Sequence, residues 1–492
     1  MRALLSVGLL VALAGQGLAQ AKPAEPGGEK PKAEAGEVAK APAAWKLPDR
    51  EAGKLDRLLG EFLHPKKSED RKKTLEKVEK LVAKDVDGHS ILEDVEAIVH
   101  MANRHRYFNP KLASKRGKID MVQVKPEVHG FPGKIGTVKY HLYLPRKYSD
   151  KQLWPLLFCL PDAKKWPDGA KYIQEAWVAR SPRIADGYIV VVPVPQSKGE
   201  AWTALKTYPR AMIALRHAAG NFEATKKEGG PATDMLRIFI DGEGAASLVA
   251  ARFPEIFAGA ILHRCDGRAG SGPNLRTSGR LSGLPAFAIF EASKKRQAEF
   301  AERLQADNPS GMTARSEDVG PLGSAKTIAA WMDKLGTRVP QPPVISYTLH
   351  DPSFQRHYWI NVLGYDASLK GKPIFDATAD RAKNEIRIDL EGITRFELFL
   401  SDALVDLSKK VRVVVVEKDK EYEFLNDKAP RDVGRLLEEL LATNHPWRIY
   451  PAKYVVDLAD LRAKTAKLEA EKAKAAQKQA QEKKPDKAAK AK

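Results

Sequence analysis

Cysteine is nearly absent from this chain. Its 492 residues include only two cysteines, Cys159 and Cys265, so a framework of disulfides cannot hold the fold together. No Cys-x-x-Cys pair or Cys/His cluster has the spacing of a zinc site, and we expect neither a metal nor a cofactor. Because 43% of the residues are hydrophobic, the chain can instead bury the cores of roughly two to three domains of about 150 residues each.

Long hydrophobic runs are also missing. The apolar run near the N-terminus, residues 3–14, covers 12 residues, whereas a membrane-spanning helix needs about 20. This run follows Arg2 and precedes Ala19-Gln20-Ala21, an order typical of a secretory signal peptide with a small-x-small cleavage site. We therefore expect residues 1–21 to be a signal peptide that exports the protein. An exported chain with so little cysteine favours a bacterial periplasm, cell surface or extracellular location.

The chain has no acidic excess. Its 82 Lys and Arg against 63 Asp and Glu give 82 − 63 = +19. Residues 461–492 carry 11 basic and 4 acidic residues, or 11 − 4 = +7, and no apolar stripe. We expect them to form a basic disordered tail that makes weak contacts with anionic polymers or a membrane surface. The remaining charge is too dispersed to indicate specific nucleic-acid binding.

Order is expected to begin after residues 22–45, whose Pro, Ala, Gly, Lys and Glu are typical of a disordered linker. Apolar residues then recur at helical spacing within 55–62, 75–82 and 92–99. This pattern predicts three amphipathic helices in an N-terminal segment, residues 46–115. Because short helices rarely form a core alone, we expect the segment to pack as a cap on the domain that follows.

Residues 116–372 change to a different pattern, in which apolar runs alternate with stretches of helical period. Such runs occupy residues 155–160, 188–192, 237–240, 258–262, 285–290 and 344–349. Fully apolar strands that alternate with helices predict a mostly parallel sheet covered by helices on both faces. Residues 373–460 instead contain alternating or β-branched strands and one helix, 432–442, which predicts a small β-rich C-terminal domain.

One strand and the turn after it carry a recognisable motif. The strand 237–240 is followed by Asp241-Gly242-Glu243-Gly244-Ala245-Ala246-Ser247 and then by Phe253-Pro254 within 252–260. This segment resembles the nucleophile elbow of the α/β-hydrolase superfamily. It looks most like the secreted esterase branch related to esterase D, feruloyl esterases and polyhydroxybutyrate depolymerases, and more distantly like prolyl oligopeptidases. The resemblance spans roughly residues 134–363 and implies an α/β-hydrolase fold.

The centre of the motif departs from that family. The resemblance places Gly244 where the family keeps its serine, and glycine has no side chain with which to attack a substrate. Gly242 matches the small residue before the nucleophile, and Glu243 precedes the nucleophile position. Ser247 lies about one helical turn later and is the alternative, displaced nucleophile.

The other positions that the resemblance assigns are also degenerate. Lys294 occupies the position of the orienting acid, with Glu291 as the nearest carboxylate. Asp162 follows a proline in the loop that should supply oxyanion donors, and its charge would repel an oxyanion. His350 ends the run 344–349, where a catalytic base is expected, and His357 is the alternative base.

These departures predict an exported α/β-hydrolase-fold protein that has lost serine-hydrolase activity. Such a pseudoenzyme would act as a binding or structural protein of the cell envelope. Its ligand stays open, although the tryptophans near the expected pocket, Trp154, Trp166, Trp177 and Trp202, suit a carbohydrate or polymer. Two alternatives remain: an active secreted esterase or peptidase with a displaced nucleophile, and a polyanion-binding envelope protein that uses its basic tail.

Overall fold

The computed structural model describes residues 45–482 except 107, 126–135, 197–207, 221–228, 266–283, 292, 308–313, 318–324, 350–354, 370 and 444. The expected signal peptide, nearly all of the expected linker, Trp202 and His350 lie outside the described residues. Every element described below belongs to one unit, Trp45–Lys492.

The N-terminal segment forms the three expected helices and a short hairpin. Its elements are α1 (Asp49–Leu63), α2 (Ser68–Val82), β1 (Asp85–Val86), β2 (His89–Ser90), η1 (Ile91–Glu93), α3 (Val95–Arg104) and η2 (Pro110–Lys115). The helices share a core with α10 (Val433–Thr443), which belongs to the C-terminal part of the chain. The apolar stripes of α1–α3 thus face a helix far along the chain, whereas Leu112 and Ala113 of η2 pack against the core of the domain that follows in sequence.

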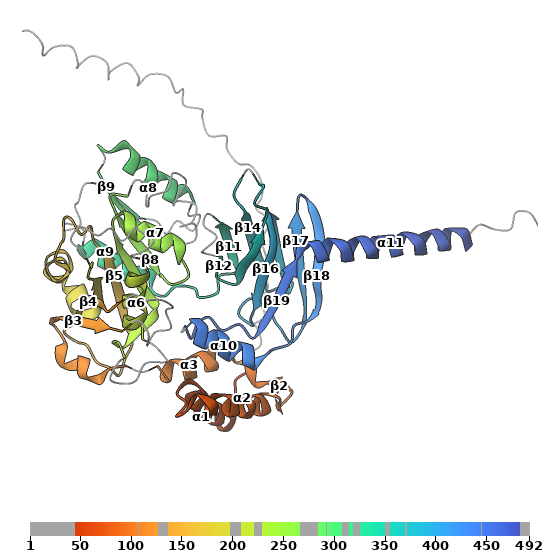
Figure 1. The fold of residues 1–492 in the computed structure, drawn as a ribbon, viewed down its shortest axis with the longest axis horizontal. Coiled ribbons are helices and arrows are strands. Elements are labelled where there is room, and N and C mark those ends of the chain that lie inside the picture. The colour runs from red at the N-terminus through yellow and green to blue at the C-terminus, as the bar shows by residue number, and fades with distance from the viewer. Residues whose placement is uncertain are drawn as a thin grey trace, which may run out of the picture. The chain divides into compact units, whose positions relative to one another are not determined.

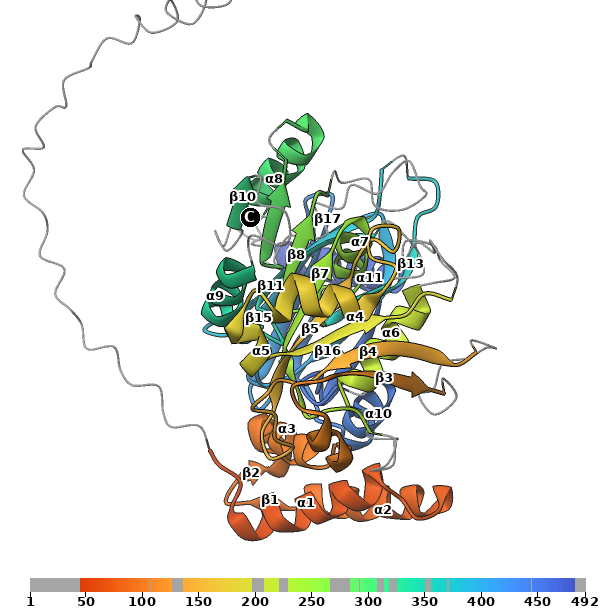
Figure 2. The same cartoon turned by 90° about the vertical axis from the view of Figure 1, so that its left-hand side faces the viewer.

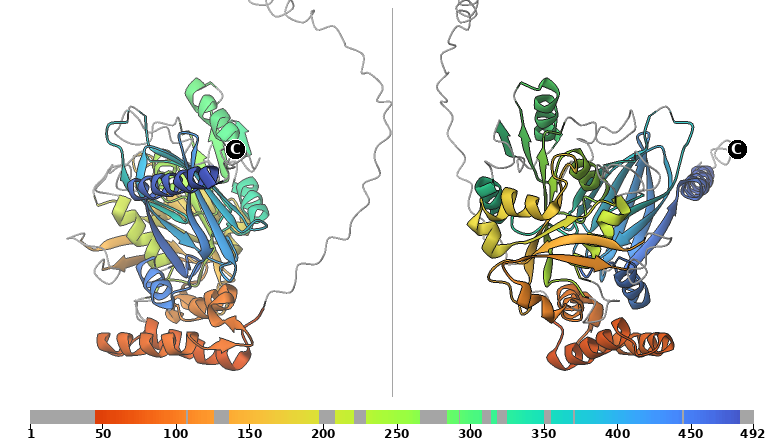
Figure 3. Two further views of the ribbon diagram at one scale, coloured as in Figure 1. Left: turned by 90° about the vertical axis from the view of Figure 1, so that its right-hand side faces the viewer. Right: turned by 60° about the vertical axis from the view of Figure 1, so that its left-hand side comes forward.

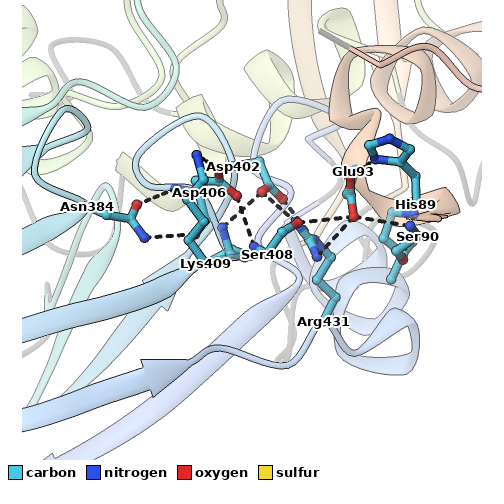
Figure 4. Close-up of polar contacts among 11 residues, drawn as sticks. His89, Ser90, Glu93, Asn384, Asp402, Asp406, Ser408, Lys409 and Arg431 are labelled. Carbon is cyan, nitrogen blue, oxygen red and sulfur yellow. Dashed lines mark hydrogen bonds and ion pairs between the residues drawn. The ribbon is translucent and has the colours of Figure 1, made fainter.

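A charged network also ties this segment to the C-terminal part (Figure 4). Arg431 donates two hydrogen bonds to Asp402, at 3.0 and 2.7 Å, and its Nη1 lies 3.7 Å from Glu93. Ser408 donates a hydrogen bond to Glu93 and accepts one from Arg431. The side chains of Arg431 and Asp402 are only 10% and 14% exposed, so the pair is largely removed from water.

The central sheet contains eight strands among the described residues. They are β3 (Ile119–Val124), β4 (Val138–Tyr143), β5 (Trp154–Leu160), β6 (Ile189–Pro193), β7 (Thr233–Gly242), β8 (Gly259–His263), β9 (Ala286–Phe290) and β10 (Ala314–Glu317). Their spatial order is β10-β9-β8-β7-β5-β6-β4-β3, and all run in one direction except β4. This order and orientation define the α/β-hydrolase fold, so the expected fold class is confirmed.

Helices cover both faces of this sheet (Figure 2). They are α4 (Gly169–Tyr172), η4 (Ile173–Val178), α5 (Pro182–Gly187), α6 (Tyr208–Ala218), α7 (Gly244–Arg252), α8 (Lys295–Asp307) and α9 (Ala325–Leu335). Successive strand residues point to opposite faces. Leu156, Phe158 and Leu160 enter the core under α6, α7 and α8, whereas Leu157 and Cys159 enter the core under η4, α5 and α9. Burial on both faces explains the continuous apolar strands.

The C-terminal part is a β-sandwich (Figures 1 and 3). Its five-stranded sheet is β11 (Val344–Thr348), β14 (Ile374–Asp380), β15 (Glu385–Glu391), β17 (Lys410–Glu417) and β18 (Lys420–Lys428). Its four-stranded sheet is β12 (Arg356–His357), β13 (Ile360–Tyr365), β16 (Ile393–Leu400) and β19 (Ala452–Asp457). Both sheets contribute to one hydrophobic core, so this β-rich region is separate from the parallel sheet.

The run 344–349 forms a strand, but its expected place in the parallel sheet was wrong. As β11 it pairs antiparallel with β14 and alternates exposed with buried residues. The boundary between the α/β part and the sandwich therefore lies between α9 and β11 in the chain. The sequence analysis placed this boundary at 372/373. An apolar run indicates a strand, but it does not identify the strand with which it will pair.

The tail was expected to be disordered, but the structure shows a helix up to residue 482. Helix α11 (Leu458–Glu482) projects from the sandwich (Figure 1). Its first turns are anchored by Leu461, which is 4% exposed, and by Arg462, which pairs with Glu417 at 2.6 Å. The following residues are mainly Ala, Lys, Glu and Gln, which favour helix without needing a buried face. In the described part of the chain, no helix combines the length and apolarity that crossing a membrane requires.

Candidate functional site

The strand-to-helix turn of the hydrolase fold is formed by β7 and α7. Strand β7 ends at Gly242, Glu243 is the single residue between the two elements, and α7 begins at Gly244. Gly242 has φ +148°, and a Cβ atom there would lie 2.3 Å from the carbonyl oxygen of Leu160. Because only glycine fits that space, the sharp turn itself requires Gly242.

Glu243 is held in an ion pair at this turn. Its Oε1 lies 2.8 Å from Lys165 Nζ, and the same ammonium lies 3.9 Å from Asp162 Oδ2. The side chains of Glu243 and Asp162 are 29% and 30% exposed, so both carboxylates are accessible from solvent. The residue at the turn, Glu243, thus carries a carboxylate that is paired with Lys165.

The structure places the expected nucleophile positions inside α7. Gly244 is the first residue of the helix and offers no side chain. Ser247 is fully buried, and its hydroxyl donates a hydrogen bond to the carbonyl oxygen of Gly244 at 2.9 Å. A hydroxyl that is buried and engaged with its own helix is not presented to a substrate.

The loop after β5 uses its backbone donors internally. The N–H groups of Lys165 and Trp166 donate to the carbonyl oxygen of Asp162, at 3.0 and 2.8 Å. The N–H of Lys164 donates to the Asp162 carboxylate at 3.0 Å. In the family that this chain resembles, this loop supplies N–H groups to an oxyanion. Here Asp162 accepts hydrogen bonds from three successive N–H groups, which are therefore not free for that task.

A buried Asp–His pair lies directly beneath the turn, and the sequence analysis missed it. Asp241 Oδ1 is 2.5 Å from His263 Nε2, and the Tyr172 hydroxyl donates to Asp241 Oδ2 at 2.6 Å. Asp241 is fully buried and His263 is 2% exposed. Burial raises the pKa of the Tyr172 hydroxyl and of the Cys159 thiol, and the Asp241 carboxylate adds to both increases.

Strand register explains how this cluster forms. Cys159 and Asp241 are paired residues of β5 and β7, and Asp241 pairs with Ile261 of β8. His263 lies two residues after Ile261 and therefore points to the same face. A sequence signal existed, because Asp241 and His263 are polar residues at the ends of apolar runs. Their contact depends on a register that the sequence alone did not provide.

After β9, where the resemblance expects the carboxylate that orients a catalytic histidine, neither Glu291 nor Lys294 contacts a histidine among the described residues. Glu291 forms an ion pair with Arg264 at 2.9 Å. Lys294 is exposed, and its N–H donates to the carbonyl oxygen of Glu291 in a turn. These two residues therefore form the surface of the loop that leads into α8.

Of the two expected histidines, the structure describes only His357, and it does not lie at the turn. The parallel sheet ends with β10, and the sequence 318–324 that follows it contains no histidine. His350 lies outside the described residues and follows β11, a strand of the sandwich. His357 is in β12 of the sandwich, where its ring stacks on Tyr347 with centroids 4.5 Å apart. Burial lowers the pKa of His357 to about 3.

Tryptophans near the sheet are mainly packing residues. Trp177 and Trp154 are 0% and 7% exposed, so neither presents a ring to solvent. Trp166 is half-buried and packs edge-on against Tyr172, with ring centroids 5.1 Å apart. The described residues contain no group of three or more His, Cys, Asp or Glu side chains arranged to hold a metal.

A hollow of about 740 Å³ lies at one end of the sandwich, among the loops of β13, β15 and β17. Five of its fifteen lining residues are acidic, and Tyr365, Lys418 and Arg462 also line it. Arg462 is already paired with Glu417 in that lining. The hollow is thus separate from the strand-to-helix turn.

Comparison with known proteins gives matches at the level of solved structures. No protein-family model matches the sequence, and no curated protein matches it. A thermostable esterase aligns with TM-score 0.31 and 16% identity, over 44% of this chain and 60% of that chain. A hyperthermophilic esterase from the archaeon Pyrobaculum calidifontis aligns with TM-score 0.34 and 13% identity, over 50% and 95% of the two chains. Ferric enterobactin esterase from Salmonella typhimurium aligns with TM-score 0.30 and 14% identity, over 44% and 57%.

Proposed function

We propose that this protein is an exported α/β-hydrolase-fold protein that does not perform serine hydrolysis and acts by binding at the cell envelope. The observation that carries the proposal is the strand-to-helix turn. Its apex is Glu243, held by Lys165 at 2.8 Å, and Gly244 begins the helix without a side chain. A carboxylate paired with an ammonium at this position cannot replace the hydroxyl that attacks an ester carbonyl in serine hydrolysis.

Three further observations support the proposal that serine hydrolysis is lost. The N–H groups of Lys164, Lys165 and Trp166 are engaged with Asp162. The resemblance places Lys294 at the position of the orienting acid, and residues 318–349, which follow β10, contain no histidine. Since the oxyanion donors, the base and the acid act as a unit with the nucleophile, a missing nucleophile together with these changes supports loss of activity.

The enzyme alternative has one specific observation in its favour, the pair Asp241–His263. Such a pair could serve as acid and base for a nucleophile other than serine, because His263 Nδ1 has no hydrogen-bond partner among the described residues. Cys159 is a neighbouring thiol, but it is fully buried and burial raises its pKa, which disfavours the reactive thiolate.

A second binding mode is supported by α11. Most of its residues after Leu461 are exposed and many are lysines, so they can contact an anionic polymer or membrane surface. The contact would be electrostatic, and raising the salt concentration from about 0.05 M to about 0.5 M should abolish it. Unchanged affinity across that range, or unchanged affinity after deletion of residues 463–492, would exclude this mode.

The proposal is tested by a fluorophosphonate probe and by hydrolysis of short acyl esters with purified full-length protein. We expect no labelling and no turnover above background. An active esterase of the same fold is the positive control for the probe. Stoichiometric labelling that Ser247→Ala abolishes would show a displaced serine nucleophile. Turnover that Cys159→Ala or His263→Ala abolishes would instead support the alternative enzyme.

A further inference from the structure

Three largely buried arginines lie where the C-terminal end of the α/β part meets the sandwich. Arg338 follows α9 and is 8% exposed, Arg356 lies in β12, and Arg448 lies between α10 and β19. The side chains of Arg356 and Arg448 are 20% and 12% exposed. All three guanidinium groups are close enough to Tyr450 to lower the pKa of its buried hydroxyl, although burial raises that pKa overall to about 12.

The carboxylates in this cluster do not balance its positive charge. Arg356 pairs with Glu439, and Arg448 Nη2 lies 3.6 Å from Glu255 Oε1. Arg338 donates to His445 Nε2 at 2.7 Å. Burial and the nearby arginines hold the pKa of His445 well below its usual value, so this histidine stays neutral. Among the described residues, three guanidinium groups thus face Glu439 and Glu255, and the carboxylate of Glu397, which also interacts with Arg356, is already paired with Lys453.

Several donors of the three arginines are also unused. Arg338 Nε and Nη1, Arg356 Nη2, and Arg448 Nε are buried and have no hydrogen-bond partner among the described residues. The Tyr450 hydroxyl, which is equally enclosed, has none either. Unpaired buried donors on charged groups are costly, and proteins normally satisfy them. A buried water could accept some of these hydrogen bonds, but it would not neutralise the excess charge.

We propose that Arg338, Arg356 and Arg448 form a binding site for an oxyanion of the phosphate or sulfate type. Guanidinium groups match the oxygens of such anions in geometry as well as charge. A carboxylate offers only two oxygens to donors that come from three separate segments, whereas a tetrahedral oxyanion offers more. Glu255 and Tyr450 would lie at the border of the site. The inference is independent of lost hydrolysis, because none of these residues belongs to the β7–α7 turn.

The test uses the full-length protein and inorganic phosphate, with chloride at matched ionic strength as the reference. We expect calorimetry to show one saturable phosphate site and thermal unfolding to shift upward in phosphate. Arg338→Gln and Arg448→Gln should each weaken phosphate binding by about tenfold or more. The matched control is Arg387→Gln on the sandwich surface, where Arg387 is 42% exposed and pairs with Glu421. That variant should bind phosphate like the parent protein.

A second variant keeps the test informative if loss of a buried arginine prevents folding. Glu255→Gln removes a negative charge that faces Arg448 and should tighten phosphate binding. Equal unfolding temperatures in phosphate and chloride would overturn the proposal, as would a phosphate effect that persists in Arg338→Gln and Arg448→Gln. Glycerol 2-phosphate distinguishes the sources of the anion. Binding as tight as that of inorganic phosphate supports an esterified ligand, and binding of inorganic phosphate alone supports a free anion.

Discussion

Lys165 Nζ lies 2.8 Å from Glu243 Oε1, so the apex of the strand-to-helix turn is occupied by an ion pair. Lys165 comes from the loop after β5, and Glu243 from the end of β7. In a serine hydrolase of this fold, the same two segments provide the oxyanion donors and the nucleophile. Their contact therefore places a salt bridge at this edge of the sheet.

Gly244→Ser should not restore hydrolysis of short acyl esters. The new hydroxyl would lack an oxyanion hole, and losing one oxyanion donor alone raises the barrier by about 3–4 kcal/mol. We also expect it to lack a base, since residues 318–349, which follow β10, contain no histidine. Glu243→Ser, which places a hydroxyl at the apex itself, is the matched variant and should be equally inactive. Measurable turnover in either variant that His350→Ala removes would show that only the nucleophile had been lost.

Gly242→Ala should destabilise the protein by about 3 kcal/mol or more. The added Cβ would lie 2.3 Å from the Leu160 carbonyl oxygen, and φ at this residue is +148°. Both the contact and the backbone conformation oppose a side chain. The control is Gly53→Ala in α1, where a Cβ meets nothing within 4 Å, and a gain of about 0.5–1 kcal/mol is expected because alanine favours helix. Chemical denaturation of both variants provides the comparison. A Gly242→Ala protein as stable as its parent would contradict this account of the turn.

Local patterns were sufficient to predict the parallel sheet and its turn. The apolar runs of β5, β7 and β8 are continuous because both faces of each strand are buried. The small residues around Glu243 reflect the sharp turn, where a Cβ on Gly242 would meet Leu160 of the neighbouring strand. Both features leave a pattern within a short stretch of sequence, so they can be recognised without a structure.

Long-range partners could not be read in the same way. β11 has the apolar content of a sheet strand, but its pairing with β14 depends on the whole sandwich. Arg338 and His445 are separated by 107 positions, and no local pattern connects them. The pair Asp241–His263 is closer in sequence, yet its contact requires the register of adjacent parallel strands. The sequence thus identified the strand-to-helix turn but missed the Asp241–His263 pair beneath it and the contact between Arg338 and His445.

Arg431→Gln should cost about 3 kcal/mol of stability. Its removal leaves Asp402 buried with a charge that no longer has its bidentate partner (Figure 4). Burial already raises the pKa of Asp402, and Arg431 opposes that rise. Loss of Arg431 therefore raises the pKa of Asp402 further. Protonation of Asp402 then stabilises the folded state of the variant relative to its unfolded state.

The sign of this effect gives a clear pH test. A carboxyl group whose folded-state pKa is above its unfolded value binds more protons when folded, so stability increases as pH falls toward and below that pKa. Relative to the parent, Arg431→Gln should recover stability between about pH 7 and about pH 4.5. The double variant Arg431→Met with Asp402→Leu, which removes both charges, should recover much of the loss at neutral pH. Urea unfolding at both pH values measures each effect. A constant deficit at all pH values would argue against an uncompensated Asp402 carboxylate.

His357→Phe should reduce the loss of stability in acid. His357 is buried against Tyr347 and Phe375, and burial lowers its pKa from 6.5 to about 3. Between those values the unfolded chain binds the proton and the folded chain does not, so folding is progressively destabilised as pH falls from about 6.5 toward 3. One such group contributes a slope of at most about 1.4 kcal/mol per pH unit.

Phenylalanine preserves the ring packing and cannot titrate. Unfolding free energies of parent and variant, measured from about pH 7 down to about pH 4.5, should therefore diverge in favour of the variant as pH falls. The pKa of His445 is also lowered by burial, so the stability of the variant still decreases somewhat as pH falls. Parallel curves for the two proteins would mean that His357 is protonated in the fold and that the neutral, buried role described for it is wrong.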